Sequence, residues 1–403
     1  MFFLNRHADH GKPLDPADQD TFGPQAVRQA EAHARARPGY AETPLVSLDA
    51  LAREQGVAGL LLKDESTRFG LGSFKALGGA YAVTRLVLEA GSQALKRPLD
   101  VDDLRDPAVQ VVARGVVVAC ATDGNHGRSV AQGAQWVGAK AVIFVHAGVS
   151  QARIDAIAAF GAEIVRVDGN YDDSVERAAA VSQERGWTVL SDTSWPGYER
   201  IPAMVMQGYT TLLAEAGRRM PTPPTHVFVQ AGVGGIAAAA AAWFSLAHGA
   251  RRPRFVVVEP ARAACLYDSA RAGVRTRIAA GDPTVMAMLE CYEPSLVAWR
   301  ILTRAADAYL TVDDDQAVAA MRRLADPLPG DPAIVAGESG AAGLAGFLAA
   351  AQDTGMRAAL GIDAQSRILA INTEGATDPA LYARLVGRTP RQVLAGRRPP
   401  SQA

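Results

Sequence analysis

The stretch Ser66-Thr67-Arg68-Phe69-Gly70-Leu71-Gly72-Ser73-Phe74-Lys75-Ala76-Leu77-Gly78-Gly79 sets an amine, that of Lys75, between a glycine-rich turn and a helical run that begins at Ala76. Backbone N–H groups at a helix N-terminus favour anions. Lysine forms Schiff bases with carbonyl compounds, and an apolar neighbour such as Phe74 favours its uncharged, nucleophilic form. Such a position suits a lysine that binds a phosphorylated carbonyl cofactor, but most lysines near a helix start are simply solvated, so this stretch alone leaves both interpretations open.

The composition is that of a globular protein with a small substrate. With 403 residues, of which 49% are hydrophobic, the chain can bury a large core in two or three domains. Its 41 Lys and Arg residues balance 42 Asp and Glu residues, so no net field draws it to nucleic acid or to an acidic membrane. A small neutral or zwitterionic substrate suits this balance.

Cysteine spacing and hydropathy argue against two further classes of protein. Cys120, Cys265 and Cys291 are far apart, which disfavours a disulfide framework or a metal site, and each is interpreted as a small buried hydrophobe. No apolar stretch reaches transmembrane length without interruption, so we expect a soluble, cytoplasmic protein that interacts with no membrane.

The chain alternates between apolar, strand-like runs and helical stretches. Strands are expected at residues 116–120, 141–145, 162–167 and 188–190, with helices at 128–137, 152–160 and 173–185 between them. Because these strands are apolar throughout, they indicate a parallel sheet covered on both faces. A second series has strands at 60–64, 226–230, 255–260 and 368–372. We thus expect an α/β protein in which residues 1–74 and 200–403 form a large domain and residues 75–199 a small one, with residues 1–45 as an outer arm.

Two turns in these series carry candidate functional groups. Gly232-Val233-Gly234-Gly235 precedes an alanine-rich helix, where its backbone N–H groups can surround an anion. The turn has neither the spacing nor the Lys-Ser/Thr of a nucleotide P-loop, so we expect it to hold a single phosphate; a close-packed turn is the alternative.

The other turn is Thr122-Asp123-Gly124-Asn125-His126-Gly127-Arg128, which follows the strand at residues 116–120. The Asn125 amide can donate to a phenolic oxygen of a cofactor. Asp123 is either a functional carboxylate or the N-cap of the following helix, and His126 is interpreted as structural.

These motifs, together with Asn372-Thr373-Glu374-Gly375, occur in the order seen in the pyridoxal-phosphate enzymes of fold type II, the tryptophan synthase β-subunit fold. Within that group the chain resembles the diaminopropionate ammonia-lyases from residue 40 to residue 380. The more specific similarities are Arg68-Phe69-Gly70-Leu71, residues 122–128, Asp192-Thr193-Ser194-Trp195-Pro196-Gly197-Tyr198, Met206-Gln207-Gly208-Tyr209 and Ala336-Gly337-Glu338-Ser339-Gly340-Ala341.

The resemblance implies a pyridoxal 5'-phosphate cofactor held covalently by Lys75, next to Phe74. Asn125 would contact the ring oxygen of the cofactor and Thr373 its pyridine nitrogen, while its phosphate would lie on Gly232, Val233, Gly234 and Gly235. A neutral hydroxyl at the pyridine nitrogen leaves the ring unprotonated, which favours elimination of a β-substituent over reprotonation. Glu338 would either approach the ring or cap the helix that follows it.

The same resemblance implies two bases on opposite faces of the substrate, Lys75 and Asp123, so that one site deprotonates both enantiomers. Asp192 would pair with a cationic β-ammonium group of the substrate, or else cap a turn before Trp195. Three residues depart from the family pattern near the expected substrate position. Gly72 and Ser73 stand where Asn-Ala is usual, and Tyr292 stands where glycine is usual.

Together these features predict a homodimeric lyase of amino-acid metabolism that acts on 2,3-diaminopropionate, D or L, and yields pyruvate and ammonia through 2-aminoacrylate. One alternative is another β-eliminating or β-replacing enzyme of the same fold, similar to the serine and threonine dehydratases. Another is a cofactor-retaining binding protein without catalysis, which the departures at Gly72, Ser73 and Tyr292 would allow.

Overall fold

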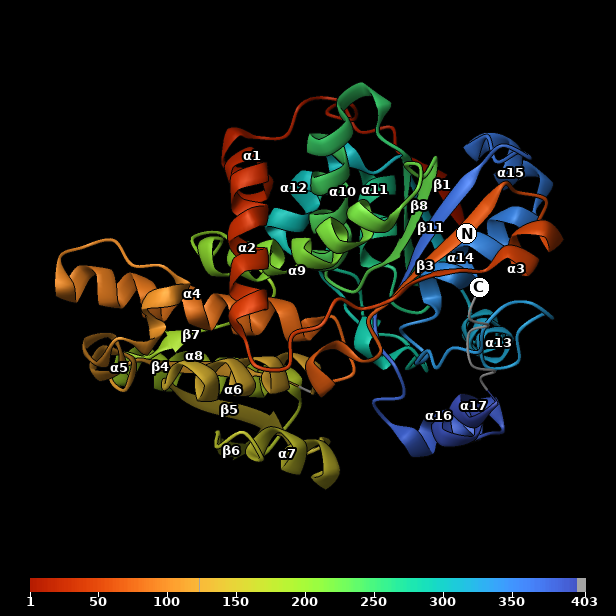
Figure 1. Cartoon of the computed structure of the whole chain (residues 1–403). Coiled ribbons are helices and arrows are strands. Elements are labelled where there is room, and N and C mark those ends of the chain that lie inside the picture. Colours follow the sequence, from red (N-terminus) through yellow and green to blue (C-terminus); the bar gives the residue numbers. More distant parts are fainter. Residues whose placement is uncertain (123, 397–403) are drawn as a thin grey trace, which may run out of the picture. The chain divides into compact units, whose positions relative to one another are not determined.

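The computed structural model describes residues 1–122 and 124–396, and the chain divides into two compact units, each with its own sheet (Figure 1). The larger unit comprises Met1–Gly23, Glu42–Thr67 and Leu212–Ala403, and the smaller comprises Pro24–Ala41 and Arg68–Thr211. The longer segment of the smaller unit therefore begins at Arg68 and ends at Thr211, where boundaries at residues 74 and 199 were expected. The smaller unit also includes helix α2 (Pro24–Ala36), which packs against α4 (Lys75–Leu95).

The smaller unit holds a parallel four-stranded sheet in the order β6-β5-β4-β7. Its strands are β4 (Val117–Ala121), β5 (Lys140–His146), β6 (Glu163–Val167) and β7 (Thr188–Val189), and its further helices are α5 (Pro107–Ala113), α6 (Asn125–Val137), α7 (Gln151–Ala158) and α8 (Tyr171–Arg185). The strand and helix alternation predicted from the sequence is therefore confirmed. Helix α9 (Arg200–Arg219) begins in this unit and ends in the larger one.

Helices α4 and α6 pack closely in the smaller unit. A Cβ atom on Gly133 of α6 would lie 2.5 Å from the Ala80 Cα of α4, so a glycine is needed at this crossing. Helix α4 runs through Gly91 to Leu95, and a Cβ atom on Gly91 would lie 2.7 Å from the Leu99 Cδ1. The crossing fixes the start of α4 relative to the start of α6.

The larger unit holds a seven-stranded sheet in the order β1-β10-β9-β8-β11-β3-β2. The five central strands are parallel, and the two edge strands are antiparallel to their neighbours. The strands are β1 (Phe2–Leu4), β2 (Leu45–Ser47), β3 (Gly59–Asp64), β8 (His226–Gln230), β9 (Arg254–Pro260), β10 (Ala308–Val312) and β11 (Arg367–Asn372). Strands β1, β2 and β10 were not expected, and the prediction that residues 1–45 form an outer arm is wrong because β1 pairs with β10.

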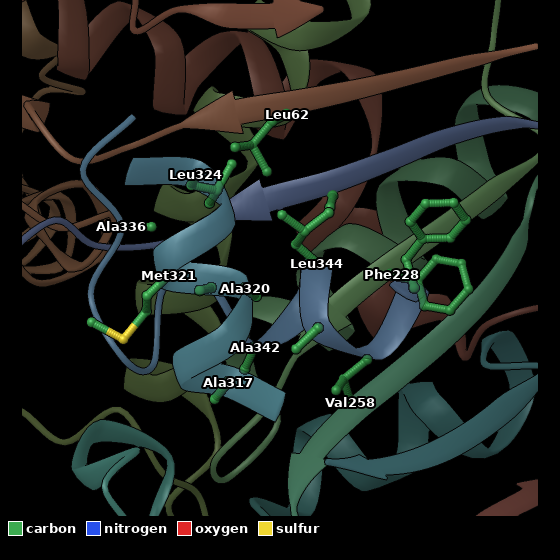
Figure 2. Close-up of a cluster of buried hydrophobic side chains, with 14 of the residues drawn as sticks. Leu62, Phe228, Val258, Ala317, Ala320, Met321, Leu324, Ala336, Ala342 and Leu344 are labelled. Carbon is green, nitrogen blue, oxygen red and sulfur yellow. The ribbon is translucent and has the colours of Figure 1, made fainter. Parts of the chain in front are cut away.

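The core of the larger unit lies under helix α14 (Ala342–Gln352), which packs against the central strands and against helix α13 (Asp314–Ala325). Figure 2 shows Leu344 of α14 among apolar side chains of the sheet, such as Leu62 and Phe228, and of α13, such as Met321 and Leu324. The remaining helices of this unit are α1 (Pro16–Phe22), α3 (Asp49–Glu54), α10 (Gly235–His248), α11 (Cys265–Ala272), α12 (Leu296–Ala305), α15 (Thr354–Leu360), α16 (Pro379–Val386) and α17 (Pro390–Ala395). Close packing of this kind holds the strand ends rigidly.

Each sheet has one point at which the strand order reverses. In the larger unit the chain runs from β8 to β9 and β10 on one side, and β11 then lies on the other side of β8. In the smaller unit it runs from β4 to β5 and β6, and β7 then lies on the other side of β4. Loops that follow the carboxyl ends of strands at such a point are the usual ligand-binding segments of open α/β sheets.

Among residues 1–122 and 124–396, no helix has both the length and the apolar character needed to cross a membrane.

Candidate active site

Lys75 is the first residue of α4, one residue before the helix start expected at Ala76. Its backbone N–H lies 3.4 Å from the Ser73 hydroxyl oxygen, which accepts a weak hydrogen bond at the helix start. The Phe74 ring lies 5.6 Å from the Lys75 Nζ and 4.7 Å from the buried ring of Tyr209. The amine therefore has an apolar, aromatic wall on one side.

The Lys75 ammonium is paired with the Asp192 carboxylate, because Nζ donates a short hydrogen bond to Oδ2. Burial by itself would raise the pKa of Asp192, but the charge of the Lys75 ammonium and its hydrogen bond outweigh burial and hold that pKa below its usual range. Asp192 is therefore ionised at neutral pH. The smaller unit thus contains a carboxylate that binds a primary ammonium group.

Hydrogen bonds from two side chains, His126 and Tyr198, hold the loop that follows β7 and carries Asp192. His126 Nε2 donates to the Leu190 carbonyl oxygen at 3.0 Å, and burial lowers the pKa of His126 so that the ring stays neutral. The Tyr198 hydroxyl donates to the Val189 carbonyl at 2.8 Å and accepts from the Ser191 N–H at 3.0 Å. His126 is structural, as the sequence analysis expects, and the role of Tyr198 was not foreseen.

The turn after β4 is stabilised by hydrogen bonds to the Thr122 side chain. The Thr122 hydroxyl oxygen accepts hydrogen bonds from the N–H groups of Gly124 and Gly127, both at 3.1 Å. Asn125 follows as the first residue of α6 and is buried. Asp123, the predicted second base, lies outside the described residues. Because β4 and β7 are neighbours at the reversal of the sheet, Asn125 and Asp192 follow adjacent strand ends.

In the larger unit the glycine turn joins β8 to α10 and leaves no space for a side chain at Gly232 or Gly234. Gly234 has φ 100°, and a Cβ atom there would lie 3.0 Å from the Ala298 Cβ. A Cβ atom on Gly232 would lie 2.8 Å from the Cys291 Sγ. The first N–H groups of a helix have no partners within it, so the start of α10 at Gly235 can bind an anion. Close packing and anion binding are compatible here.

Thr373 follows β11, the strand next to β8, and therefore lies at the same sheet edge as the glycine turn. Its buried hydroxyl oxygen accepts a hydrogen bond from the Gln230 Nε2 at 2.8 Å. The sequence analysis did not single out Gln230. The available signal was a lone amide at the end of a fully buried strand.

The remaining predicted residues have the following surroundings. Glu338 is buried in the turn before α14, where the Gly337 N–H donates to the Glu374 carbonyl at 2.9 Å. The Tyr292 hydroxyl donates to the Glu290 carboxylate at 2.7 Å, and burial together with this carboxylate raises the pKa of Tyr292 to about 12. No cluster of His, Cys, Asp and Glu suited to a metal ion occurs within the described part of the chain.

Comparison with known proteins gives a consistent result. A model of the pyridoxal-phosphate dependent enzyme family matches residues 36–374. Over 356 residues the chain is 41% identical to the diaminopropionate ammonia-lyase of Escherichia coli K12, an alignment that covers 86% of this chain and 88% of the relative.

Two solved structures extend this similarity to nearly the whole chain. The Escherichia coli diaminopropionate ammonia-lyase in complex with D-serine superposes with a TM-score of 0.85 at 37% identity, covering 96% of each chain. The same enzyme in complex with an aminoacrylate-PLP azomethine reaction intermediate superposes with a TM-score of 0.83 at 37% identity, again over 96% of each chain. The matches confirm the fold class predicted from the sequence.

Proposed function

Because this chain belongs to the pyridoxal-phosphate-dependent enzyme family, we propose that it is an ammonia-lyase acting on 2,3-diaminopropionate. It removes the α-proton, expels the β-amino group as ammonia and releases 2-aminoacrylate, which water hydrolyses to pyruvate and a second ammonia. A small amino-acid substrate agrees with the net charge of −1 of the chain, because this charge favours no polyanionic partner.

The residues present suit pyridoxal 5'-phosphate. Lys75 offers the amine that would hold its carbonyl carbon, and Asn125 an amide for its ring oxygen. The start of α10 offers N–H groups for its phosphate, next to Gly232 and Gly234, whose surroundings exclude a Cβ atom. Thr373 offers a hydroxyl for its pyridine nitrogen. When bound, the cofactor withdraws electrons from the Cα of an attached amino acid, which makes the α-proton acidic and the β-substituent a leaving group.

The pairing of Lys75 with Asp192 is the observation that favours a diamino substrate. The β-ammonium of 2,3-diaminopropionate is a primary ammonium like that of Lys75. When Lys75 Nζ is joined to the cofactor, the ionised Asp192 carboxylate can bind the substrate's ammonium instead. Once the substrate's α-amino group has displaced it from the cofactor, the Lys75 amine would be free to take the α-proton on one face, and Asp123 is proposed to take it on the other.

A keto-acid assay over a panel of β-substituted alanines tests this function. Both enantiomers of 2,3-diaminopropionate are expected to give pyruvate, and both enantiomers of serine are expected to react more slowly. The proposal would be replaced by another β-eliminating activity if 2,3-diaminopropionate gave no pyruvate while a hydroxy- or thio-substituted alanine was turned over well. A visible cofactor band without keto acid from any compound would instead indicate a binding protein.

Replacing Asp192 with asparagine is expected to lower kcat/KM for 2,3-diaminopropionate by roughly 10- to 150-fold, since a hydrogen bond to a charged group contributes about 1.5–3 kcal/mol. The loss with serine should be smaller because a hydroxyl group needs no counter-charge. Steady-state assays on both substrates measure the difference, with Asp155→Asn on the exposed face of α7 as the matched control. An equal loss on both substrates would show that the Asp192 carboxylate acts only on Lys75 and does not bind the β-ammonium of the substrate.

The departures at Gly72, Ser73 and Tyr292 are proposed to adjust the shape of the substrate site. Ser73 adds a hydroxyl next to Lys75, and Tyr292 adds a phenol that is bonded to Glu290. The expected homodimer and cytoplasmic location stay predictions, and the molar mass in solution would check the first.

A further inference from the structure

The Gln230 side chain is completely buried at the carboxyl end of β8, directly before the glycine turn. Its Nε2 lies near four acceptors: the carbonyl oxygens of Ser339 (3.1 Å), Gly340 (2.8 Å) and Ile371 (3.0 Å), and the Thr373 Oγ1 (2.8 Å). Carbonyl oxygens only accept hydrogen bonds, so the amide nitrogen, not the amide oxygen, must face this group.

The opposite end of the same amide has no hydrogen bond. Gln230 Oε1 is buried without a partner among the described residues, and it lies against Gly343 of α14, where a Cβ atom would be 2.6 Å away. An unpaired buried acceptor is costly, and its presence in a core calls for an explanation. The chain tolerates this cost while keeping an N–H donor aimed at Thr373.

The direction of this hydrogen bond decides what the Thr373 hydroxyl can do. A hydroxyl has one proton to donate and lone pairs to accept with. Because Thr373 Oγ1 accepts from Gln230, its own proton remains available, and the described residues contain no group to which it donates. A hydroxyl held in this way presents a proton, and an unprotonated ring nitrogen is the acceptor that matches it.

We propose that Gln230 is a positioning residue that holds the Thr373 hydroxyl as a donor toward the pyridine nitrogen of the cofactor, and thereby keeps that nitrogen unprotonated. The inference rests on the proposed function, since it requires pyridoxal phosphate to bind next to Thr373. Without the Gln230 amide, the hydroxyl is free to donate to a neighbouring backbone carbonyl and to present a lone pair instead. Protonation of the ring nitrogen then becomes favourable.

A purely structural role is the competing explanation, because the same amide also bridges β8 to the turn at Ser339 and Gly340. Asn372 supplies a matched control. It is a buried amide at the same sheet edge, and its Nδ2 bridges Asp64 (2.8 Å) and the Val335 carbonyl (3.2 Å), without contacting the Thr373 hydroxyl.

The test compares Gln230→Met, Thr373→Val, the double variant and Asn372→Leu. The readouts are the absorption spectrum of the bound cofactor as a function of pH, the dissociation constant of pyridoxal phosphate from the apoprotein, and the urea midpoint of the apoprotein. Gln230→Met and Thr373→Val are each expected to shift the spectrum in the same direction and to weaken cofactor binding by about tenfold, the value of one ordinary hydrogen bond. The double variant should match Thr373→Val, and Asn372→Leu should lower only the urea midpoint.

Wild-type spectrum and affinity in Gln230→Met, or losses that multiply in the double variant, would overturn the inference. If Gln230→Met does not fold, Gln230→Asn keeps an amide in the core but is one methylene too short to reach Thr373, and the same shift is expected from it. Failure of the proposed function is a separate result, because it would show as wild-type protein that binds no pyridoxal phosphate or releases no pyruvate.

Discussion

Lys75→Ala is expected to lower pyruvate formation from 2,3-diaminopropionate by about 10⁴-fold or more, because it removes both the covalent attachment of the cofactor and one of the two bases. The fold should survive, since Lys75 is partly exposed at the first position of α4 and alanine has the highest helix propensity. Steady-state assays, with far-ultraviolet circular dichroism as the check on folding, measure the loss. Lys140→Ala, an exposed lysine at the start of β5 in the same unit, is the control and should keep wild-type activity.

The covalent attachment of the cofactor to Lys75 can be measured by mass spectrometry, without an assay of activity. The sequence contains five lysines, Lys12, Lys63, Lys75, Lys96 and Lys140. After borohydride reduction and tryptic digestion, the cofactor mass is expected on one peptide, residues 69–85, because trypsin does not cleave after a modified Lys75. Cofactor mass on another lysine, or activity retained in Lys75→Ala, would contradict the proposed role.

Asp123→Asn is expected to lower kcat for D-2,3-diaminopropionate by about 10²- to 10⁴-fold, the range that a general base contributes, and to affect the L isomer much less. The reason is stereochemical: if Lys75 serves one face of the Cα, only the base on the opposite face is lost. Separate assays on the two pure enantiomers check this.

The hydrogen bonding of the residues on either side of Asp123 indicates that this substitution leaves the turn intact. Thr122 and Gly124 are joined by a hydrogen bond of 3.1 Å that does not involve the residue between them, so the turn should persist in the variant. Asp192→Asn is the comparison, because it should affect both enantiomers alike. A similar loss on both enantiomers from Asp123→Asn would remove the two-base assignment.

The sequence predicted the parallel strands well where consecutive residues are all apolar and therefore indicate burial on both faces. Runs such as Val227-Phe228-Val229 and Val256-Val257-Val258 are apolar on both faces, a pattern that only a covered sheet accommodates. The glycine turn was likewise predicted, and the start of α4 was predicted to within one residue, since glycines between a strand and a helix are a local signal.

The edges of the larger sheet were not predicted, because short strands depend on their neighbours. Phe2–Leu4 and Leu45–Ser47 each span three residues and are partly exposed, so neither has enough apolar residues to produce a pattern. Ala308–Val312, the strand next to the edge strand β1, is fully buried and contains the strand-favouring residues Tyr309, Thr311 and Val312, so here the sequence carried a signal that the prediction missed. The pairing of Phe2–Leu4 with Ala308–Val312, across about three hundred residues, cannot be detected in a local sequence window.

By itself, the sequence determined the α/β class, the two sheets, the position of the candidate lysine and the order of the motifs, because these depend on local hydrophobicity, glycine positions and residue chemistry. Only the tertiary structure decided that the Asp192 carboxylate meets the Lys75 ammonium, and that the Gln230 amide meets the Thr373 hydroxyl. Both contacts join residues more than a hundred positions apart, and hydrogen bonds act over about 3 Å. Which partners come within that distance is therefore set by strand order and helix packing, not by any neighbouring residue.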